Sequence, residues 1–388
     1  MFKLIISKIQ RSVGLLFLLM MPQFIYADLI HYKIGIAFSR TDKYDRSTQQ
    51  IINGIQIAKL YFEKKHPEYK IDFVKYTFQP NNLASVVKIA NQICRDKILV
   101  VIGGEMSEDA LVLGQILNSC HVVLVSPTAT NPKVGEKKPF VFRVSASDDD
   151  VAKKLADYTY HAFKPSVIGI IDDVSLPYPD FLTKEFLNNY LYISKGRIIV
   201  KKVLRENIDY SSEIDDFIRK HVPVVVMLTY DIDLKRFVSQ ASERNYFPIY
   251  IGSDGWGSNE SIVKIMRDNP LYQKHFIGYR NNYWKNDISN KLNMKFKSLY
   301  RFHYRSEPDA WNAIGFDSTW IVLSALSKYF HNINSEILKN EIAKTHNLQL
   351  LTSGNFEFKP NNTPVKDLNI YKITSNGASY ITTLRGGK

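Results

Sequence analysis

Two short segments of this chain place hydroxyl side chains directly after apolar runs. Residues 101–107 read Val-Ile-Gly-Gly-Glu-Met-Ser, and residues 125–132 read Val-Ser-Pro-Thr-Ala-Thr-Asn-Pro. Ser107 stands where a helical pattern begins, in the position of an N-cap, so its hydroxyl lies near the free backbone N–H groups of the first turn. Such a serine usually serves only its own helix. Because a second hydroxyl-rich loop follows a neighbouring strand, the two segments together predict a pocket for a carboxylate.

Motifs of nucleotide, metal and hydrolase chemistry are absent from the sequence. There is no G-x-x-x-x-G-K-S/T, and residues 39–42, Ser-Arg-Thr-Asp, lack the glycines that a dinucleotide site needs after its first strand. No H-E-x-x-H or G-x-S-x-G occurs, and the nine histidines are scattered. We therefore expect no enzyme, no cofactor and no metal, although an active site assembled from distant loops stays open as an alternative.

The first 27 residues have the pattern of a secretory signal. They carry Lys3, Lys8 and Arg11 and no acid, then an apolar run over 13–21, and they end at Ala27. A membrane anchor would need about 20 apolar residues, which this run does not reach. No cysteine lies near Ala27 to carry a lipid. We expect cleavage after this segment and a soluble, exported protein without a lipid anchor.

The chain is basic, with 51 Lys and Arg residues against 38 Asp and Glu residues and a formal charge of +13. Removal of the signal would leave 48 basic residues and a charge of +10. These charges are spread through the helical segments and do not form a basic stripe beside aromatic residues. We therefore expect no nucleic-acid partner, and at most mild attraction to anionic surfaces.

The mature chain alternates between short apolar runs and amphipathic stretches. Predicted strands lie at 33–38, 71–75, 98–102, 122–125, 167–171, 197–203, 224–228 and 249–251, and predicted helices at 47–64, 84–94, 108–118, 149–163 and 234–244. Most strands are rich in Val and Ile without polar alternation, which is typical of strands covered on both faces. The repetition predicts parallel sheets wrapped by helices.

Two α/β lobes are expected, because eight strands are too many for one compact sheet of ordinary size. The turn-rich stretch 126–140, with three prolines, reads as a connection between them. A mostly helical stretch over 286–343 is followed by short predicted strands at 354–358, 369–373 and 380–383. Elements added after the second lobe indicate that the chain crosses between the lobes more than once.

Cys94 and Cys120 each end a predicted helix just before a strand. Since these neighbouring elements should be adjacent in the sheet, the two residues can approach bonding distance. An oxidising compartment favours a disulfide between them, and two buried free thiols are the alternative. Intact mass before and after alkylation would separate these two states.

At this point a resemblance becomes specific. The stretch VIGGEMSEDALVLGQILNSCHVVLVSPTATNPKV resembles a segment of type I periplasmic binding proteins, in particular the leucine/isoleucine/valine-binding proteins of ABC importers. The resemblance covers nearly the whole mature chain, including KIGIAFSRTDKYDRSTQQIINGIQIA, VIGIIDDVSLPYPDFL, VVVMLTYDIDLKRFVSQASERNYFPIYIGSDGWG and FEFKPNNTPVKDLNIYKI. It implies two Rossmann-like lobes with parallel sheets joined by three crossovers. We expect lobe boundaries at 28–145 plus 282–362 and at 146–281 plus 363–388.

The resemblance also implies a function and a set of ligand-binding residues. The protein would be a periplasmic monomer that captures an amino acid, or a related small zwitterion, between its lobes and presents it to an ABC transporter permease. Ser107 and Thr130 would bind the α-carboxylate with backbone groups of Thr128 and Ala129. Asp254, between two glycines, would bind the α-ammonium. Tyr230 would lie beside the ammonium, Tyr178 would close on the ligand, and Tyr44 and Phe316 would line the side-chain pocket.

Two departures from the family pattern concern acidic residues. Glu108 and Asp109 stand in the first helical turn after Ser107, where the family tends to have small hydroxyl residues. They favour the helix dipole but would oppose a ligand carboxylate if they faced it. Glu105 stands where leucine-binding members have an apolar pocket wall. If Glu105 faces the cleft, a polar or cationic ligand side chain is favoured over an aliphatic one.

A second class of function uses the same fold without transport. The chain would then be a ligand-free or sensory interaction protein of the cell envelope that docks onto a receptor or a cell-wall synthase. An apolar patch outside the cleft and no thermal shift with any amino acid would favour this alternative.

Overall fold

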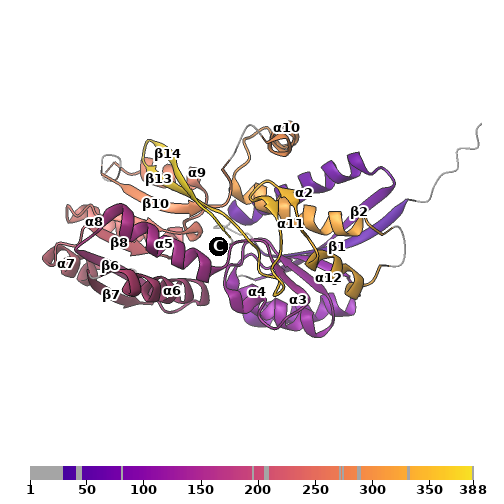
Figure 1. The fold of residues 1–388 in the computed structure, drawn as a ribbon, viewed down its shortest axis with the longest axis horizontal. Helices are drawn as coiled ribbons and strands as arrows, with labels where there is room; N and C mark the ends of the chain where they lie inside the picture. Colours follow the sequence, from indigo (N-terminus) through magenta and orange to yellow (C-terminus); the bar gives the residue numbers. More distant parts are fainter. Residues whose placement is uncertain are drawn as a thin grey trace, which may run out of the picture.

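The computed structural model describes residues 29–40, 46–79, 82–194, 196–204, 209–270, 272, 275–285, 290–329 and 333–386. The predicted signal segment and Tyr44 lie outside these residues. The described chain forms two lobes side by side, each an α/β sandwich around its own sheet (Figure 1). No described helix has the length and apolar character that crossing a membrane requires.

The first lobe is built on five parallel strands in the order β2-β1-β3-β4-β5. Its strands are β1 (Ile30–Ser39), β2 (Tyr69–Phe78), β3 (Val100–Gly103), β4 (Val123–Ser126) and β5 (Val141–Arg143). The inner strands are apolar and buried along their whole length, because helices cover both faces. One face packs against α2 (Arg46–Lys65), α11 (Ala310–Leu326) and α12 (Ser335–Ala343), and the other against α3 (Leu83–Arg95) and α4 (Ser107–Ser119).

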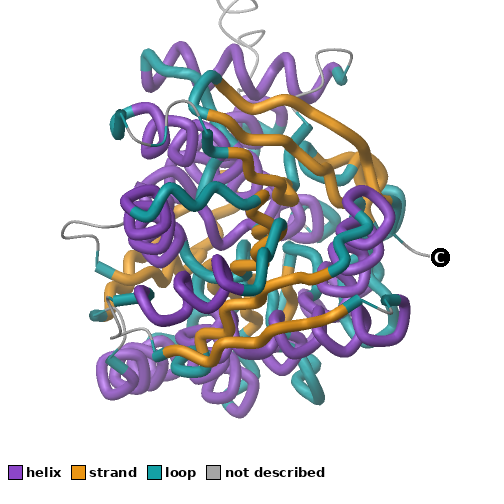
Figure 2. The backbone as a smooth tube through the Cα atoms, turned by 90° about the vertical axis from the view of Figure 1, so that its left-hand side faces the viewer, coloured by secondary structure: helices purple, strands orange, loops and turns teal. Residues whose placement is uncertain are grey.

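The second lobe contains seven strands in the order β14-β13-β10-β9-β8-β6-β7. Its strands are β6 (Val167–Asp173), β7 (Arg197–Val203), β8 (Val224–Met227), β9 (Ile249–Gly252), β10 (Ile277–Asn282), β13 (Leu368–Thr374) and β14 (Gly377–Leu384). Strand β13 pairs antiparallel with both β10 and β14, and the other neighbouring strands pair parallel. One face packs against α5 (Asp148–Phe163) and α6 (Pro177–Ile193), and the other against α7 (Ser211–Arg219), α8 (Asp231–Glu243) and α9 (Asn259–Arg267). Figure 2 shows helices on both sides of the strands.

The parallel strands of the two sheets are connected in the same order. In each, the first strand in the chain lies between the second and the third, so the strand order reverses beside it. A crevice opens at such a reversal, at the carboxyl ends of the strands, and ligands of doubly wound sheets bind there. The reversal falls between β1 and β3 in the first lobe and between β6 and β8 in the second.

The predicted fold class is confirmed: two α/β lobes are present, and all eleven predicted strands and five predicted helices correspond to elements of the structure. One strand of the second sheet, β10, was not predicted. Its sequence Ile-Gly-Tyr-Arg-Asn-Asn carries three polar residues that are nevertheless buried. The apolar signal on which strand prediction depends is therefore missing from it.

The chain passes between the two sheets after β5, after β10 and before β13. A buried ionic group holds the last of these connections to the first lobe. The carboxylate of Asp317 on α11 accepts hydrogen bonds from the backbone of Leu351 at 2.8 Å and from the backbone and hydroxyl of Thr352 at 2.9 and 2.6 Å. The Lys366 ammonium donates to the same hydroxyl. Burial lowers the pKa of Lys366 to about 8, although the charge of Asp317 opposes this shift.

A disulfide joins Cys94 near the end of α3 to Cys120 just after α4, with the two Cα atoms 5.9 Å apart. It fastens two helices that cover the same face of the first sheet. The bond closes a loop over a sequence separation of 26 residues. It therefore reduces the conformational freedom of the unfolded chain.

Replacing both cysteines with serine is expected to lower the free energy of unfolding by about 2–4 kcal/mol, because the unfolded chain regains that freedom. Urea unfolding followed by circular dichroism measures the change. Treatment of the wild-type protein with a reductant should lower its free energy of unfolding by the same amount. Equal unfolding midpoints for the oxidised wild type and the double variant would contradict this expectation.

Candidate functional site

The first half of the site lies at the carboxyl ends of β3 and β4. Ser107 is buried, and its hydroxyl accepts a hydrogen bond from the backbone N–H of Asn131 at 3.3 Å. Met106, not Ser107, is the cap residue of α4. The predicted N-cap position is therefore corrected by one residue: Ser107 already belongs to the first turn, and its hydroxyl contacts the neighbouring loop.

That neighbouring loop is held in place by its own polar groups. The hydroxyl of Thr128 donates to the carbonyl of Glu105 at 2.7 Å, and the backbone N–H of Ala129 donates to the Ser126 hydroxyl at 3.3 Å. The carbonyl of Thr130 accepts from the backbone N–H of Asp148 at 3.0 Å. These bonds fix the two loops against each other, and the carboxylate pocket between them stays a prediction.

Asp254 provides the acidic group of the second lobe. It begins the short helix η2 (Asp254–Trp256) directly after β9 and is only 5% exposed. Its Oδ2 accepts from the Tyr283 hydroxyl at 2.6 Å, and its Oδ1 accepts from the Tyr178 hydroxyl at 3.3 Å. Burial raises the pKa of Asp254, while the Tyr283 hydrogen bond and the charge of Arg280 oppose the rise. A carboxylate in such surroundings is suited to accept an ammonium group.

Tyr178, in the first turn of α6, is held beside Asp254 by a small network. Its hydroxyl accepts from the backbone N–H of Gly255 at 3.2 Å and lies 2.7 Å from the Ser253 hydroxyl. The ring of Tyr230 lies against that of Tyr178, with centroids 5.3 Å apart. Since a phenol has one proton, donation to Asp254 requires the Ser253 hydroxyl to donate to Tyr178.

Three polar residues of the site were not predicted. Arg280 belongs to the unpredicted strand β10, and Tyr283 belongs to the connection after it. The guanidinium of Arg280 donates to the carbonyls of Asn281 and Gly257. Asp148 starts α5, and burial together with the charge of Asp254 raises its pKa well above the ordinary value, while the Thr130 hydroxyl and Arg143 oppose the rise. Asp148 and Asp149 stand beside each other at a helix start, which reads in sequence as an ordinary first turn.

Glu108 connects the two lobes directly. It lies in the first turn of α4, and its two carboxylate oxygens accept from the backbone N–H of Tyr178 at 3.3 Å and from the Tyr230 hydroxyl at 3.4 Å. The Asn131 amide adds a bond to the carbonyl of Pro177 at 3.2 Å. Two of the tyrosines expected at the ligand are thus brought to the interface between the lobes, where they contact each other and Glu108.

Glu105 and Asp109 place two further carboxylates beside these loops. Glu105 is 6% exposed and Asp109 is 3% exposed. Burial raises the pKa of Asp109 to about 7, and the charges of Glu105 and Glu108 raise it as well. The lobe that carries the predicted carboxylate pocket therefore also carries three acidic side chains close together.

Phe316 is the predicted site residue that the structure does not bring to this group. It lies on α11, which is buried around nearly its whole circumference. The Phe316 ring packs against Tyr61, Phe296 and Trp320, with centroids 6.0, 5.3 and 6.0 Å away. These contacts are with residues of the first lobe, and the expectation that Phe316 lines a ligand pocket stays a prediction. Tyr44, also predicted to line the side-chain pocket, lies outside the described residues.

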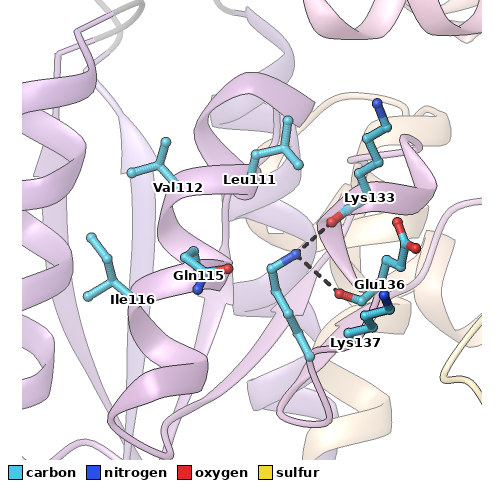
Figure 3. A pocket seen from close by; sticks show the side chains of 8 residues that line it. Leu111, Val112, Gln115, Ile116, Lys133, Glu136 and Lys137 are labelled. Carbon is cyan, nitrogen blue, oxygen red and sulfur yellow. Dashed lines mark hydrogen bonds between the residues drawn. The ribbon is translucent and has the colours of Figure 1, made fainter.

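A separate groove of about 570 Å³ lies on the outer side of α4, between residues 111–116 and 133–138 (Figure 3). The Lys138 ammonium closes one side of it by donating to the carbonyls of Lys133 and Glu136 at 2.7 and 3.4 Å. None of the predicted site residues lines this groove. Among the described residues, no group of His, Cys, Asp and Glu is arranged to hold a metal ion.

Two lobes whose parallel strands follow the same order are joined by three connections and meet at buried polar groups from both, which is the architecture of a two-lobed binding protein. The sequence matches the profile of the periplasmic binding protein family over residues 31–378. The chain belongs to this family, which confirms the resemblance noted above. Members of the family are periplasmic solute-binding proteins that bind small molecules and deliver them to ABC transporter permeases; they are not enzymes.

Curated relatives are distant. The leucine-specific-binding protein of Salmonella typhimurium is 23% identical over 180 residues, which cover 46% of this chain and 48% of that protein. The Leu/Ile/Val-binding protein homolog 1 of Brucella abortus is 22% identical over 254 residues, or 65% of this chain and 66% of that protein. The match thus spans about half to two thirds of the length of these relatives.

Solved structures share the fold over nearly the whole chain. A leucine-binding protein from Thermotoga maritima has a TM-score of 0.80 at 20% identity, with coverage of 91% of this chain and 99% of its own. LivJ from Streptococcus pneumoniae, in complex with isoleucine, has a TM-score of 0.78 at 18% identity, covering 90% and 99%. A solute-binding protein from R. palustris in complex with 4-hydroxybenzoate has a TM-score of 0.79 at 11% identity, covering 92% and 98%.

Proposed function

We propose that this protein captures an amino acid, or a related small zwitterion, between its lobes for ABC import. The observation that supports the proposal concerns Asp254: it is a buried carboxylate of one lobe that accepts from Tyr178 and Tyr283, and Tyr178 also contacts Glu108 of the other lobe. A zwitterion needs donors at one end and a negative charge at the other. Helix α4 and the loop after β4 provide the donors.

The acidic character of the site favours an amino acid over an aromatic acid. Some structural neighbours hold leucine or isoleucine, and others hold benzoates. A benzoate carries a negative charge and no ammonium. The charge of Asp254 would oppose a benzoate, because a buried charge needs a partner of opposite sign. An ammonium group, in contrast, gains from this carboxylate.

A thermal-shift screen with the twenty amino acids and a set of benzoates tests this function. A ligand that binds the folded state raises the melting temperature by mass action. We expect a shift with at least one amino acid and none with the benzoates. A shift with benzoates alone would contradict the proposal. The absence of a shift with every compound would also contradict it and would favour the interaction-protein alternative.

Removing a hydroxyl from the first half of the site should weaken binding. Ser107→Ala and Thr130→Ala are each expected to reduce affinity by about 1–3 kcal/mol, because the ligand carboxylate loses a hydrogen-bond donor in a buried place. Isothermal titration calorimetry measures the change. Ser119→Ala is the matched control, since that serine is exposed at the far end of the same helix. Unchanged affinity in both site variants would refute the assignment of these residues.

A further inference from the structure

The order of the strands places the polar groups of the first lobe in a row. At the carboxyl edge of the sheet β4, β3 and β1 are neighbours, so the loop with Thr128 and Thr130 comes first, Glu105 and Asp109 come next, and Ser39 comes last. A ligand whose carboxylate is bound between the loops after β4 and β3 can extend along this row toward β1. Its side chain then reaches the reversal of strand order between β3 and β1.

Glu105 occupies that reversal. Its Oε1 accepts from the backbone N–H of Ser39 at 3.1 Å, from the Ser39 hydroxyl at 2.5 Å and from the Thr48 hydroxyl at 3.2 Å. These donors, at the end of β1 and on α2, turn the carboxylate away from β4 and toward β1. The backbone of the same residue is bonded to Thr128, which keeps Glu105 next to the predicted carboxylate pocket.

Asp109 adds a second buried carboxylate at this place. The charge of Glu105 raises the pKa of Asp109, so the two carboxylates repel each other when both are ionised. Within the described part of the chain its Oδ1 is buried and has no hydrogen-bond partner. A buried acceptor without a partner is costly, and the cost disappears when a donor reaches it. A ligand that presents a positively charged donor satisfies this oxygen and relieves the repulsion together.

We propose that the ligand is an amino acid with a positively charged side chain, such as lysine, ornithine or arginine, whose side-chain cation is bound by Glu105 and Asp109. This inference rests on the proposed function and specifies its substrate class. An aliphatic side chain in the same position would cover both carboxylates with apolar surface and leave Asp109 without a donor. The raised pKa of Asp109 agrees with a site that lacks positive charge of its own around that oxygen.

Calorimetric titration of the purified protein with lysine, ornithine, arginine, leucine and glutamine tests the proposal. We expect at least one of the three basic amino acids to bind at least tenfold more tightly than leucine. Glu105→Gln and Asp109→Asn should each reduce affinity for that basic amino acid tenfold or more and change affinity for leucine or glutamine less. Glu136→Gln, an exposed substitution in the same lobe, is the control and should change neither.

The ranking of ligands by the wild-type protein already decides the question, so the result does not depend on whether the variants fold. Leucine or glutamine binding as tightly as every basic amino acid would overturn this inference and leave the proposed function intact. Binding of no amino acid would overturn both. A preference for a basic amino acid that both variants retain in full would overturn the assignment to Glu105 and Asp109.

Discussion

Asp254→Asn is expected to cost the protein about 2–5 kcal/mol of ligand affinity, a loss of roughly 30-fold or more. The substitution keeps the size of the side chain and an oxygen acceptor for a tyrosine, but it removes the negative charge. The ligand ammonium then lies in a buried place without its partner. Charge pairs of this kind are worth most where water is excluded, and Asp254 is only 5% exposed.

Calorimetry measures this loss, and circular dichroism shows whether the variant is folded. Asp157→Asn serves as the control, because its side chain is 64% exposed on α5 of the same lobe. The ligand affinity of Tyr283→Phe should fall between those of Asp254→Asn and Asp157→Asn, because this change removes the hydrogen bond to Asp254 and leaves the charge of Asp254 in place. Equal affinities for the wild type and Asp254→Asn would rule out an ammonium site at this residue.

The largest effect on stability is expected from Asp317→Ala. This change removes the acceptor of three hydrogen bonds and leaves the Lys366 ammonium buried without a counter-charge. Asp317 and Lys366 are buried charges joined through the Thr352 hydroxyl, and removing one of two such charges costs about 3–5 kcal/mol in free energy of unfolding. Because Lys366 lies in the last connection between the lobes, we expect unfolding of the first lobe to begin at lower denaturant concentration.

Urea unfolding of the single and double variants separates the charge from the packing. Adding Lys366→Met to Asp317→Ala should restore part of the loss, since the uncompensated charge is then gone. The contrasting case is Arg301 and Glu307, paired at 2.7 Å but 51% and 66% exposed, where Glu307→Gln should cost at most about 1 kcal/mol. If Asp317→Ala costs no more than Glu307→Gln, the ionic group does not stabilise the lobe.

The sequence predicted the parallel sheets because buried strands such as β3, β4 and β8 are continuous apolar runs. It did not predict β10, whose Arg280 is buried and donates to the carbonyls of Gly257 and Asn281. The local sequence pattern predicts burial where apolar residues follow one another in a strand or recur on one face of a helix. It carries no signal for a polar residue that is buried because distant parts of the chain supply its partners.

The candidate site shows the same division. Ser107, Thr130 and Asp254 follow strands directly, so their positions could be predicted from the chain alone. Tyr283 comes from a connection between lobes, and no spacing rule brings it to Asp254. The sequence cannot decide the role of Phe316, because an apolar residue on a buried helix has the same pattern whether it faces a ligand or a core.

Glu108 has a consequence for how affinity can change over evolutionary time. The two hydrogen bonds that it accepts from Tyr178 and Tyr230 join the lobes through groups of the protein alone. Contacts that favour the closed arrangement supply part of the free energy of closure, and a ligand needs to supply only the remainder. Substitutions at this contact would raise or lower the affinity for every ligand by the same factor. Strength of binding and choice of ligand are thereby set by different residues, and each can be altered without the other.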